Sequence, residues 1–352
     1  MGLLALGRYR AASGPVAAAL VCAAAIACSD RPAERAKAPE PASPLVVYSG
    51  RNEALVGPLL ARFEEQRGVA LEVRYGDTAE LAATLLEEGA ATPADLFLSQ
   101  DAGALGALSR EGRFRPLPQE LLERVPSRFR SPAGDWVGLS GRVRTVVYDT
   151  AQLAPGELPQ SLEEVADPRY RGRFGIAPTN ASFQAHLAVY RAVRGRAALD
   201  RLLAGMVANE PQSYPNNSAI VQAVAAGEIE WGLVNHYYLW RALEENPEGQ
   251  AANFVMPEGE ASSFVNLAGA GLLSDDAAAR ELLDFLLSAE AQEYFARQTY
   301  EYPLVPAVSP AAGLPPLAEL RTPDVDFGEV AAVLEETLAA IRDSGLLESG
   351  GG

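Results

Sequence analysis

The sequence predicts an α/β protein with two lobes, each a mainly parallel sheet flanked by helices. From Leu45 onward, short apolar runs alternate with amphipathic helical patterns, an alternation typical of parallel sheets. The 352 residues, of which 48% are hydrophobic and 21% charged, are enough to form two domains with their own cores. Polar residues follow the ends of several predicted strands, where such sheets bind ligands, so we expect a ligand cleft between the lobes.

The first predicted elements follow the order strand, helix, strand, helix, strand. The apolar run 45–48 predicts a strand, and the turn 49–52 after it contains residues suited to begin a helix. This order predicts a doubly wound half. Its other elements are a helix with one apolar face (Leu55, Leu59, Leu60 and Phe63), a strand at 69–75, a helix through Leu81, Leu85 and Leu86, and a strand at 95–98.

A second set of elements begins with the strand 143–148. Strands near residues 143 and 266 are expected to connect the lobes, which places residues 45–142 plus 268–318 in lobe 1 and 143–267 plus 319–346 in lobe 2. The other elements predicted here are strands at 174–177, 231–234 and 264–273, helices at 183–194 and 218–227, and a helical region at 275–298.

The start of the chain predicts export from the cytoplasm. Arg8 and Arg10 precede an apolar, Ala-rich run, so residues 1–27 are interpreted as a signal peptide. The run ends in Ala-Ile-Ala-Cys, which resembles a bacterial lipoprotein cleavage box with Cys28 as the lipidated residue. An ordinary secretory signal or an uncleaved anchor is the alternative. We expect residues 28–44 to form a Pro-rich tether, with the lipid as the only membrane contact, in the periplasm or on the outer face of the cytoplasmic membrane.

Composition excludes several function classes. The 29 basic and 46 acidic residues give a net charge of −17, which does not suit nucleic-acid binding. The one lysine, Lys37, lies in the predicted tether, so the folded body has no lysine for a P-loop or a Schiff base. Neither of the two cysteines lies beyond position 28, which excludes disulfides and thiolate metal sites in the body. GxSxG, HExxH and GxGxxG motifs are absent, so we expect a protein that is not an enzyme. We also expect it to be a monomer.

Three titratable residues could take a direct part in a site. His186 lies in an apolar helical pattern and is interpreted as an ordinary helix residue. His236 adjoins two tyrosines, but chain neighbours often point to different sides, so direct metal ligation is the less favoured interpretation. Asp101 follows a strand end and is equally suited to bind a ligand or to cap a helix.

Six motifs identify a known family by resemblance. The chain resembles the bacterial ferric-ion-binding proteins of ABC uptake systems, also called bacterial transferrins, from Leu45 to about Val308. The resemblance implies the type II periplasmic-binding-protein fold, Fe(III) bound by Tyr237 and Tyr238, and an ABC permease with its ATPase as partners. The motifs, in the family's order, are VVYSGRNE, ADLFLSQD, WVGLSGRVRTVVYDT, GRFGIAPTNASF, YPNNSAIVQAVAAGEIEWGLVNHYYLW and EYPLVP.

The tyrosine pair also suits iron on chemical grounds. Fe(III) is a hard trication that prefers anionic oxygen, and it must displace phenol protons that ordinarily leave near pH ~10. Asn52 and Gln100 occupy the positions where the family commonly has His and Glu, and neutral amides are poor ferric ligands. Two phenolates leave one positive charge on the ion, so we expect an exogenous oxyanion, carbonate or phosphate, to take part. The candidates to complete the coordination are Asn52, Gln100, Asp101, Tyr48 and Tyr75.

The expected anion site combines an arginine with helix N-termini. Arg142 offers a bidentate guanidinium, although a structural salt bridge is the alternative role. Free N–H groups at the start of a helix also favour oxyanions, and similar segments hold the anion in the family. The remaining candidates are Ser140, Asn180, Ala181, Ser182, Asn217 and Asn235, with Asn217 and Ser218 interpreted as a helix cap.

Three other functions remain open at this point. The same fold could bind a phosphonate, thiamine or a polyamine, because the usual His and Glu positions are lost. An envelope hydrolase would use Asp101 with a glutamate or His236, although no matched proton-transfer pair is evident. A purely structural envelope lipoprotein is the third alternative.

Overall fold

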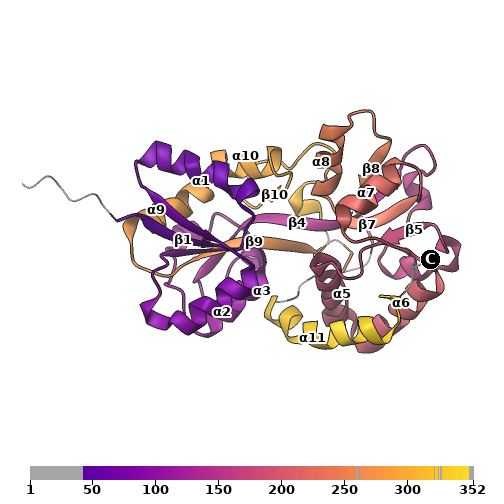
Figure 1. The fold of residues 1–352 in the computed structure, drawn as a ribbon, viewed down its shortest axis with the longest axis horizontal. Helices are drawn as coiled ribbons and strands as arrows, with labels where there is room; N and C mark the ends of the chain where they lie inside the picture. Colours follow the sequence, from indigo (N-terminus) through magenta and orange to yellow (C-terminus); the bar gives the residue numbers. More distant parts are fainter. Residues whose placement is uncertain are drawn as a thin grey trace, which may run out of the picture. The chain divides into compact units, whose positions relative to one another are not determined.

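The structure, a computed structural model, describes residues 43–258, 261–262, 264–320, 322–323, 325 and 327–348 (Figure 1). The predicted signal peptide, Cys28 and the tether as far as residue 42 lie outside the described residues. Within the described part of the chain, none of the helices is both long and apolar enough to cross a membrane.

The described strands form one mixed sheet. Their order is β2-β1-β3-β9-β4-β7-β5-β6, and β8 and β10 pair with β4. The strands are β1 (Leu45–Ser49), β2 (Leu71–Tyr75), β3 (Leu96–Ser99), β4 (Trp136–Asp149), β5 (Phe174–Ile176), β6 (Gln212–Ser213), β7 (Trp231–Asn235), β8 (Ala251–Phe254), β9 (Val265–Leu272) and β10 (Tyr302–Pro303).

The sheet combines parallel and antiparallel pairing. Strands β1, β2 and β3 pair in parallel, as do β5, β6 and β7. The antiparallel pairs all involve β4 or β9, which lie side by side in Figure 1. The α/β class is confirmed, but the description "mainly parallel" applies only to the βαβ parts. Strand β4 begins seven residues before the predicted start at Val143, because Gly138, Ser140 and Gly141 interrupt the apolar pattern of a segment that is nevertheless buried throughout.

Helices cover the sheet, and most of them begin at a polar residue whose side chain caps the first turn. One predicted helical region, 275–298, is two helices, because the Ser288 hydroxyl caps a second helix by accepting a hydrogen bond from the N–H of Ala291. The helices are α1 (Glu53–Arg67), α2 (Thr78–Glu88), α3 (Ala102–Arg110), α4 (Gln119–Leu122), α5 (Ala181–Arg194), α6 (Arg196–Ala208), α7 (Asn217–Ala225), α8 (Tyr237–Glu245), α9 (Ala277–Leu286), α10 (Ala289–Arg297) and α11 (Phe327–Asp343). Short 3-10 turns lie at Gly89–Ala91, Ser127–Phe129, Pro155–Glu157, Glu163–Ala166, Pro168–Tyr170 and Leu317–Glu319.

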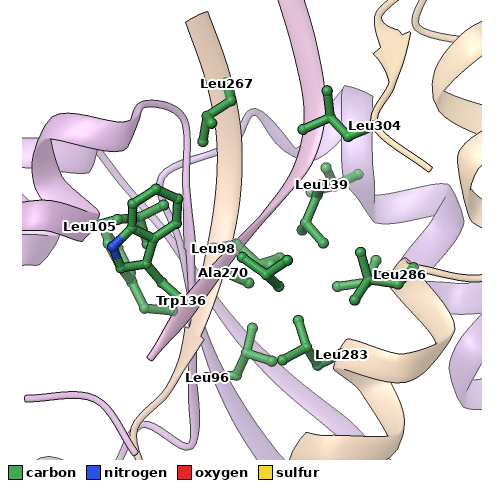
Figure 2. Close-up of a cluster of buried hydrophobic side chains, with 14 of the residues drawn as sticks. Leu96, Leu98, Leu105, Trp136, Leu139, Leu267, Ala270, Leu283, Leu286 and Leu304 are labelled. Atoms are coloured by element: carbon green, nitrogen blue, oxygen red, sulfur yellow. The ribbon is translucent and has the colours of Figure 1, made fainter. Parts of the chain in front are cut away.

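Buried apolar side chains gather in three clusters. The first draws on residues 45–143 and 265–320, and part of it appears in Figure 2, where Leu98 and Ala270 lie among leucines from several elements. The second draws on residues 146–264 and 340–346, and a smaller third cluster packs around α7. The division into two lobes stays a prediction.

Candidate ligand site

The two adjacent tyrosines open helix α8 directly after strand β7. Strand β7 is buried along its whole length and ends at the polar Asn235, after which the chain turns into α8. The ring centroids of Tyr237 and Tyr238 are 4.5 Å apart and their planes differ by 32°. Tyr237 is buried and Tyr238 half-buried. Both phenols therefore lie next to each other at the carboxyl end of a buried strand, where α/β sheets bind ligands.

A buried arginine lies beside this pair. Arg144 donates from Nη1 to Oδ1 of Asn217 (2.7 Å) and from Nη2 to the carbonyl of Leu233 (2.7 Å). Its Nε has no hydrogen-bond acceptor, and no ion pair among the described residues includes it. Burial lowers the pKa of Arg144 to about 10, while the nearby Tyr237 and Tyr238 act to raise it. The guanidinium therefore remains a cation at neutral pH, and its hydrogen-bond acceptors are neutral groups.

Polar side chains connect Arg144 to the tyrosines. Asn235 Nδ2 donates to the hydroxyls of Ser182 (3.1 Å) and Tyr237 (3.4 Å), and its Oδ1 lies 3.5 Å from Arg144 Nη1. Asn217 also accepts from the backbone N–H of Asn235 (3.2 Å), and its own Nδ2 has no partner among the described residues. The structure thus brings together four of the predicted residues, Tyr237, Asn235, Ser182 and Asn217.

Arg142 lies near the same group. It lines a small recess with Arg144, Ser182, Asn235 and others, it is 5% exposed, and its Nη1 has no hydrogen-bond acceptor among the described residues. Sequence reasoning singled out Arg142 but missed Arg144, which makes the contacts described above. The two-residue spacing within a strand was a usable signal, because such side chains share one face of a sheet.

Another arginine, Arg241, lies over the rings of the tyrosine pair. The guanidinium carbon of Arg241, one turn further along α8, lies 4.8 Å from the ring centroid of Tyr237 and 5.8 Å from that of Tyr238. Burial, followed by the charge and hydrogen bond of Tyr237, raises the pKa of Tyr238, although Arg241 and Arg144 oppose this shift. The phenol of Tyr238 is therefore protonated at neutral pH, and a bound metal must displace its proton.

Two helices begin beside this group. Asn180 caps α5 by accepting from the N–H of Ser182 (3.1 Å), and Ala181 is the first residue of that helix. Helix α7 is capped by Asn216, which accepts from the N–H of Ala219 (2.9 Å). The prediction that Asn217 is the cap is therefore wrong, because its side chain is instead buried against Arg144.

The candidates from the first half of the chain have separate local roles. Asn52 and Asp101 are the N-caps of α1 and α3, accepting from the N–H groups of Ala54 (2.8 Å) and Ala104 (3.0 Å). Gln100 directs its buried Oε1 at no donor among the described residues. The backbone N–H of Gln100 donates to the hydroxyl of Thr78. Gly50 packs against the same hydroxyl so closely that a Cβ on residue 50 would lie 2.1 Å from Thr78 Oγ1.

The two candidate third tyrosines differ in their surroundings. Tyr48 donates to Glu88 (3.0 Å) and accepts from Arg74 (3.2 Å). Tyr75 lines a hollow of about 770 Å³ together with Asn52, Glu53, Asp77 and neighbouring residues. Burial, and then the charges of Glu53 and Glu64, raise the pKa of Tyr75.

Both histidines are buried and held by backbone atoms. His186 Nε2 lies 2.8 Å from the carbonyl of Ala261, and His236 Nε2 lies 2.7 Å from that of Tyr300. Burial lowers their pKa values to about 3 and about 4, respectively. Both imidazoles are therefore neutral at neutral pH, and His186 also lines the recess that contains Arg142 and Arg144.

Ser140 has partners other than the tyrosine group. Its hydroxyl donates to Glu301 Oε2 (3.1 Å) and accepts from Arg51 Nη1 (3.2 Å). Its expected role in holding an anion has no support from these contacts.

Comparison with known proteins identifies relatives over most of the chain. The "Major ferric iron-binding protein" of Neisseria meningitidis serogroup B is 32% identical over 290 residues, which cover 80% of this chain and 87% of that protein. Iron-bound HitA from Pseudomonas aeruginosa superposes with a TM-score of 0.76 at 29% identity, covering 86% of this chain and 99% of that one. A Trichodesmium protein, IdiA (FutA), in complex with iron and citrate, has a TM-score of 0.75 at 27% identity, with coverages of 86% and 99%.

The family assignment follows from a match to a family model. Residues 91–329, more than half of the chain, match the family described as bacterial extracellular solute-binding protein. The neighbouring structures share its mixed α/β fold of a sheet flanked by helices. This chain therefore belongs to the bacterial extracellular solute-binding proteins.

Proposed function

We propose that this protein captures Fe(III) outside the cytoplasm as the cargo of an ABC importer. Tyr237 and Tyr238 are the phenolate ligands, and an exogenous oxyanion completes the site. The observation that carries the proposal is the adjacent pair of phenols, 4.5 Å apart between ring centroids, beside the buried cation Arg144. The names of the relatives, which specify ferric iron, support the same cargo.

Charge balance supports the need for an anion. Two phenolates reduce the three charges of Fe(III) to one, and the buried Arg142 and Arg144 each add a positive charge nearby. A buried charge without a counterion is costly. A dianion such as carbonate or phosphate would offset much of this charge, accept hydrogen bonds from Arg144 Nε and Arg142 Nη1, and bind the ion. Ser182 and the start of α5 would supply further donors.

The other side of the site is proposed to use Tyr75. It lines the hollow beside Asn52, whereas the hydroxyl of Tyr48 is bound to Glu88 and Arg74. Asn52 and Gln100 contribute neutral oxygens at most, so the anion supplies negative charge that a family member with His and Glu obtains from its own chain. Asp101, which caps α3, is the least suited of the candidates.

Delivery would use a permease and its ATPase. Solute-binding proteins outside the cytoplasm serve such importers, and we propose a monomeric protein held near its permease by a lipid on Cys28. Cleavage before Cys28 and lipidation can be checked together by mass spectrometry of the protein extracted from membranes.

The test of the function is spectroscopic. Purified mature protein mixed with Fe(III) and bicarbonate is expected to develop a visible phenolate-to-iron charge-transfer band. The Tyr237→Phe/Tyr238→Phe variant is expected to lose the band, because phenylalanine has no oxygen to bind the metal. Tyr214→Phe is the matched control, since its hydroxyl donates to Gln212 on an exposed surface, and it should keep the band. A wild-type protein without the band, or a double variant that retains it, contradicts the proposal.

A second candidate cargo is a metal-free organic anion such as a phosphonate. The two buried arginines favour it and disfavour a polyamine, whose positive charges they would repel. Calorimetry of the iron-free protein with a phosphonate, with thiamine and with a polyamine separates these cargoes from iron. Elemental analysis of protein purified without chelators provides the same distinction directly.

A further inference from the structure

The segment Thr299–Glu301 lies between helix α10 and strand β10 and supplies none of the ligands proposed above. It contains Glu301, a carboxylate that is 2% exposed. Its partner is Arg51, in the loop that connects β1 to α1 directly before Asn52. Arg51 Nη1 lies 3.2 Å from Glu301 Oε1 and Nη2 lies 2.6 Å from Oε2, a bidentate pair.

Two hydroxyls complete the surroundings of this carboxylate. Ser140 of β4 and Thr299 each donate to Glu301 Oε2 at 3.1 Å. Burial acts to raise the pKa of Glu301, but the charge and hydrogen bonds of Arg51, the charge of Arg142 and the Thr299 hydrogen bond together outweigh it, and the pKa lies below its ordinary value. The carboxylate is therefore charged and joins the β1–α1 loop to β4.

The preceding residue faces helix α8 instead. The carbonyl of Tyr300 accepts from His236 Nε2 (2.7 Å), and the N–H of Val143 donates to His236 Nδ1 (3.2 Å), so one tautomer satisfies both contacts. The Tyr300 ring stacks on Trp240 with centroids 6.1 Å apart, and its hydroxyl bonds Glu244. Tyr300 holds φ at +58°, a strained value for a residue with a Cβ.

Two consecutive residues thus contact the two groups of residues that the proposed function assigns to one site. Tyr300 holds the start of α8, which carries Tyr237 and Tyr238, while Glu301 holds the loop that lines the hollow with Asn52. We propose that Tyr300 and Glu301 are positioning residues for iron, which set the tyrosine pair relative to the Arg51 loop without touching the metal. This inference rests on the proposed function.

A purely structural role makes a different prediction. A buried ion pair can often be replaced by apolar residues of similar volume with little loss of folding stability. The apolar pair would fill the same space but would have no directional bonds to hold the loop in one geometry. If the pair acts by positioning, its replacement leaves the folding stability nearly unchanged but lowers the iron affinity. If the pair only stabilises the fold, both quantities change together.

The first experiment uses the mature protein with Arg51→Met/Glu301→Met. We expect its thermal midpoint without iron to stay within a few degrees of wild type. We expect its iron affinity, measured by competition with a chelator in bicarbonate, to fall at least ~10-fold, and the charge-transfer band to shift, because small misplacements of binding groups are costly. The control is Arg124→Met/Asp284→Met, which removes an ion pair on the partly exposed surface between α4 and α9 and should leave affinity and band unchanged.

A second variant covers the case in which the first does not fold. Tyr300→Gly removes the stacking on Trp240 and the hydroxyl, but glycine adopts φ +58° without strain, so the backbone carbonyl can still bond His236. We expect this variant to fold and to bind iron more weakly, with a shifted band. A folded variant of either kind with wild-type affinity and band overturns the inference. A wild-type protein that develops no band instead refutes the proposed function, and the inference with it.

Discussion

The guanidinium of Arg144 is buried at the end of β7 among amide, hydroxyl and carbonyl groups. Hydrogen bonds to Asn217 and to the carbonyl of Leu233 offset part of the cost of burying its charge, but its Nε lacks an acceptor among the described residues. An anion stabilises a buried cation better than neutral dipoles do. The residue is therefore prepared for a negatively charged partner, which the proposed oxyanion supplies.

Replacing one neutral partner by a carboxylate tests this role. In Asn217→Asp the new carboxylate would lie at the place where Oδ1 is now 2.7 Å from Arg144 Nη1, and it would neutralise the arginine from within the chain. Because the external anion then gains less from Arg144, we expect the bicarbonate enhancement of iron affinity to fall ~10-fold, about 1.4 kcal/mol. Titration of iron binding with and without bicarbonate measures it.

The control for this prediction is the preceding residue. Asn216→Asp keeps a good N-cap on α7, and its side chain bonds the N–H of Ala219 rather than Arg144. It should retain the full bicarbonate effect. An undiminished effect in Asn217→Asp would mean that Arg144 does not hold the anion.

At the scale of elements, the site depends on how closely strand β7 packs against its neighbours. Gly232 has no side chain where one would meet helix α7 and strand β5: a Cβ would lie 2.2 Å from Ile220 Cγ2 and 3.0 Å from the Gly175 carbonyl. This close approach lets Asn235, at the end of β7, reach Asn217 at the start of α7. The positions of two site residues thus follow from a glycine that touches neither.

Gly232→Ala should therefore disturb the packing of β7. We expect the free energy of unfolding to fall by about 1–3 kcal/mol, the usual cost of overpacking a core, as measured by urea denaturation. Gly156→Ala is the control, because its added methyl would meet nothing within 4 Å, and a change within about 1 kcal/mol is expected. Equal effects of the two substitutions would contradict the packing argument.

At the scale of the whole molecule, two neutral histidines are enclosed in the fold. Burial, together with the charge of Arg144, lowers the pKa of His186 to about 3, and burial lowers that of His236 to about 4. In the unfolded chain each titrates near its ordinary value of 6.5. Between pH 6.5 and these lowered pKa values, the unfolded chain binds protons that the folded chain does not. The histidines therefore do not reduce the free energy of unfolding above about pH 6.5, but they reduce it increasingly as the pH falls below that value.

His186→Gln isolates one of these two contributions. Each histidine is expected to reduce the free energy of unfolding of the iron-free protein by about 1.4 kcal/mol per pH unit below pH 6. Glutamine can still donate to the Ala261 carbonyl but does not titrate. The free energy of unfolding of the variant should therefore fall less steeply with decreasing pH, by the contribution of one histidine. Urea denaturation between pH 7 and pH 4.5 measures it, and equal slopes for variant and wild type would contradict the burial of a neutral His186.

The sequence by itself determined the α/β class, the main strands of both halves and the place of the tyrosine pair after a buried strand, but not helices α6, α8 and α11 or the short strands β6, β8 and β10. These features depend on local signals: apolar periodicity, helix caps and the residues that end a strand. The same signals were insufficient where a buried segment contains glycine and serine, and so the first half of β4 was missed.

Only the tertiary structure decided which arginine reaches the tyrosines and what Ser140 and Asn217 contact. Arg142 and Arg144 share one face of β4, but the register with β7 pairs Arg144 with Asn235, while the register with β9 pairs Arg142 with Asn266. Glu301, from the far end of the chain, likewise takes Ser140 and Arg51 as partners. Such contacts join residues about 70 to 250 positions apart, and they depend on strand pairing and packing that no local pattern in the chain encodes.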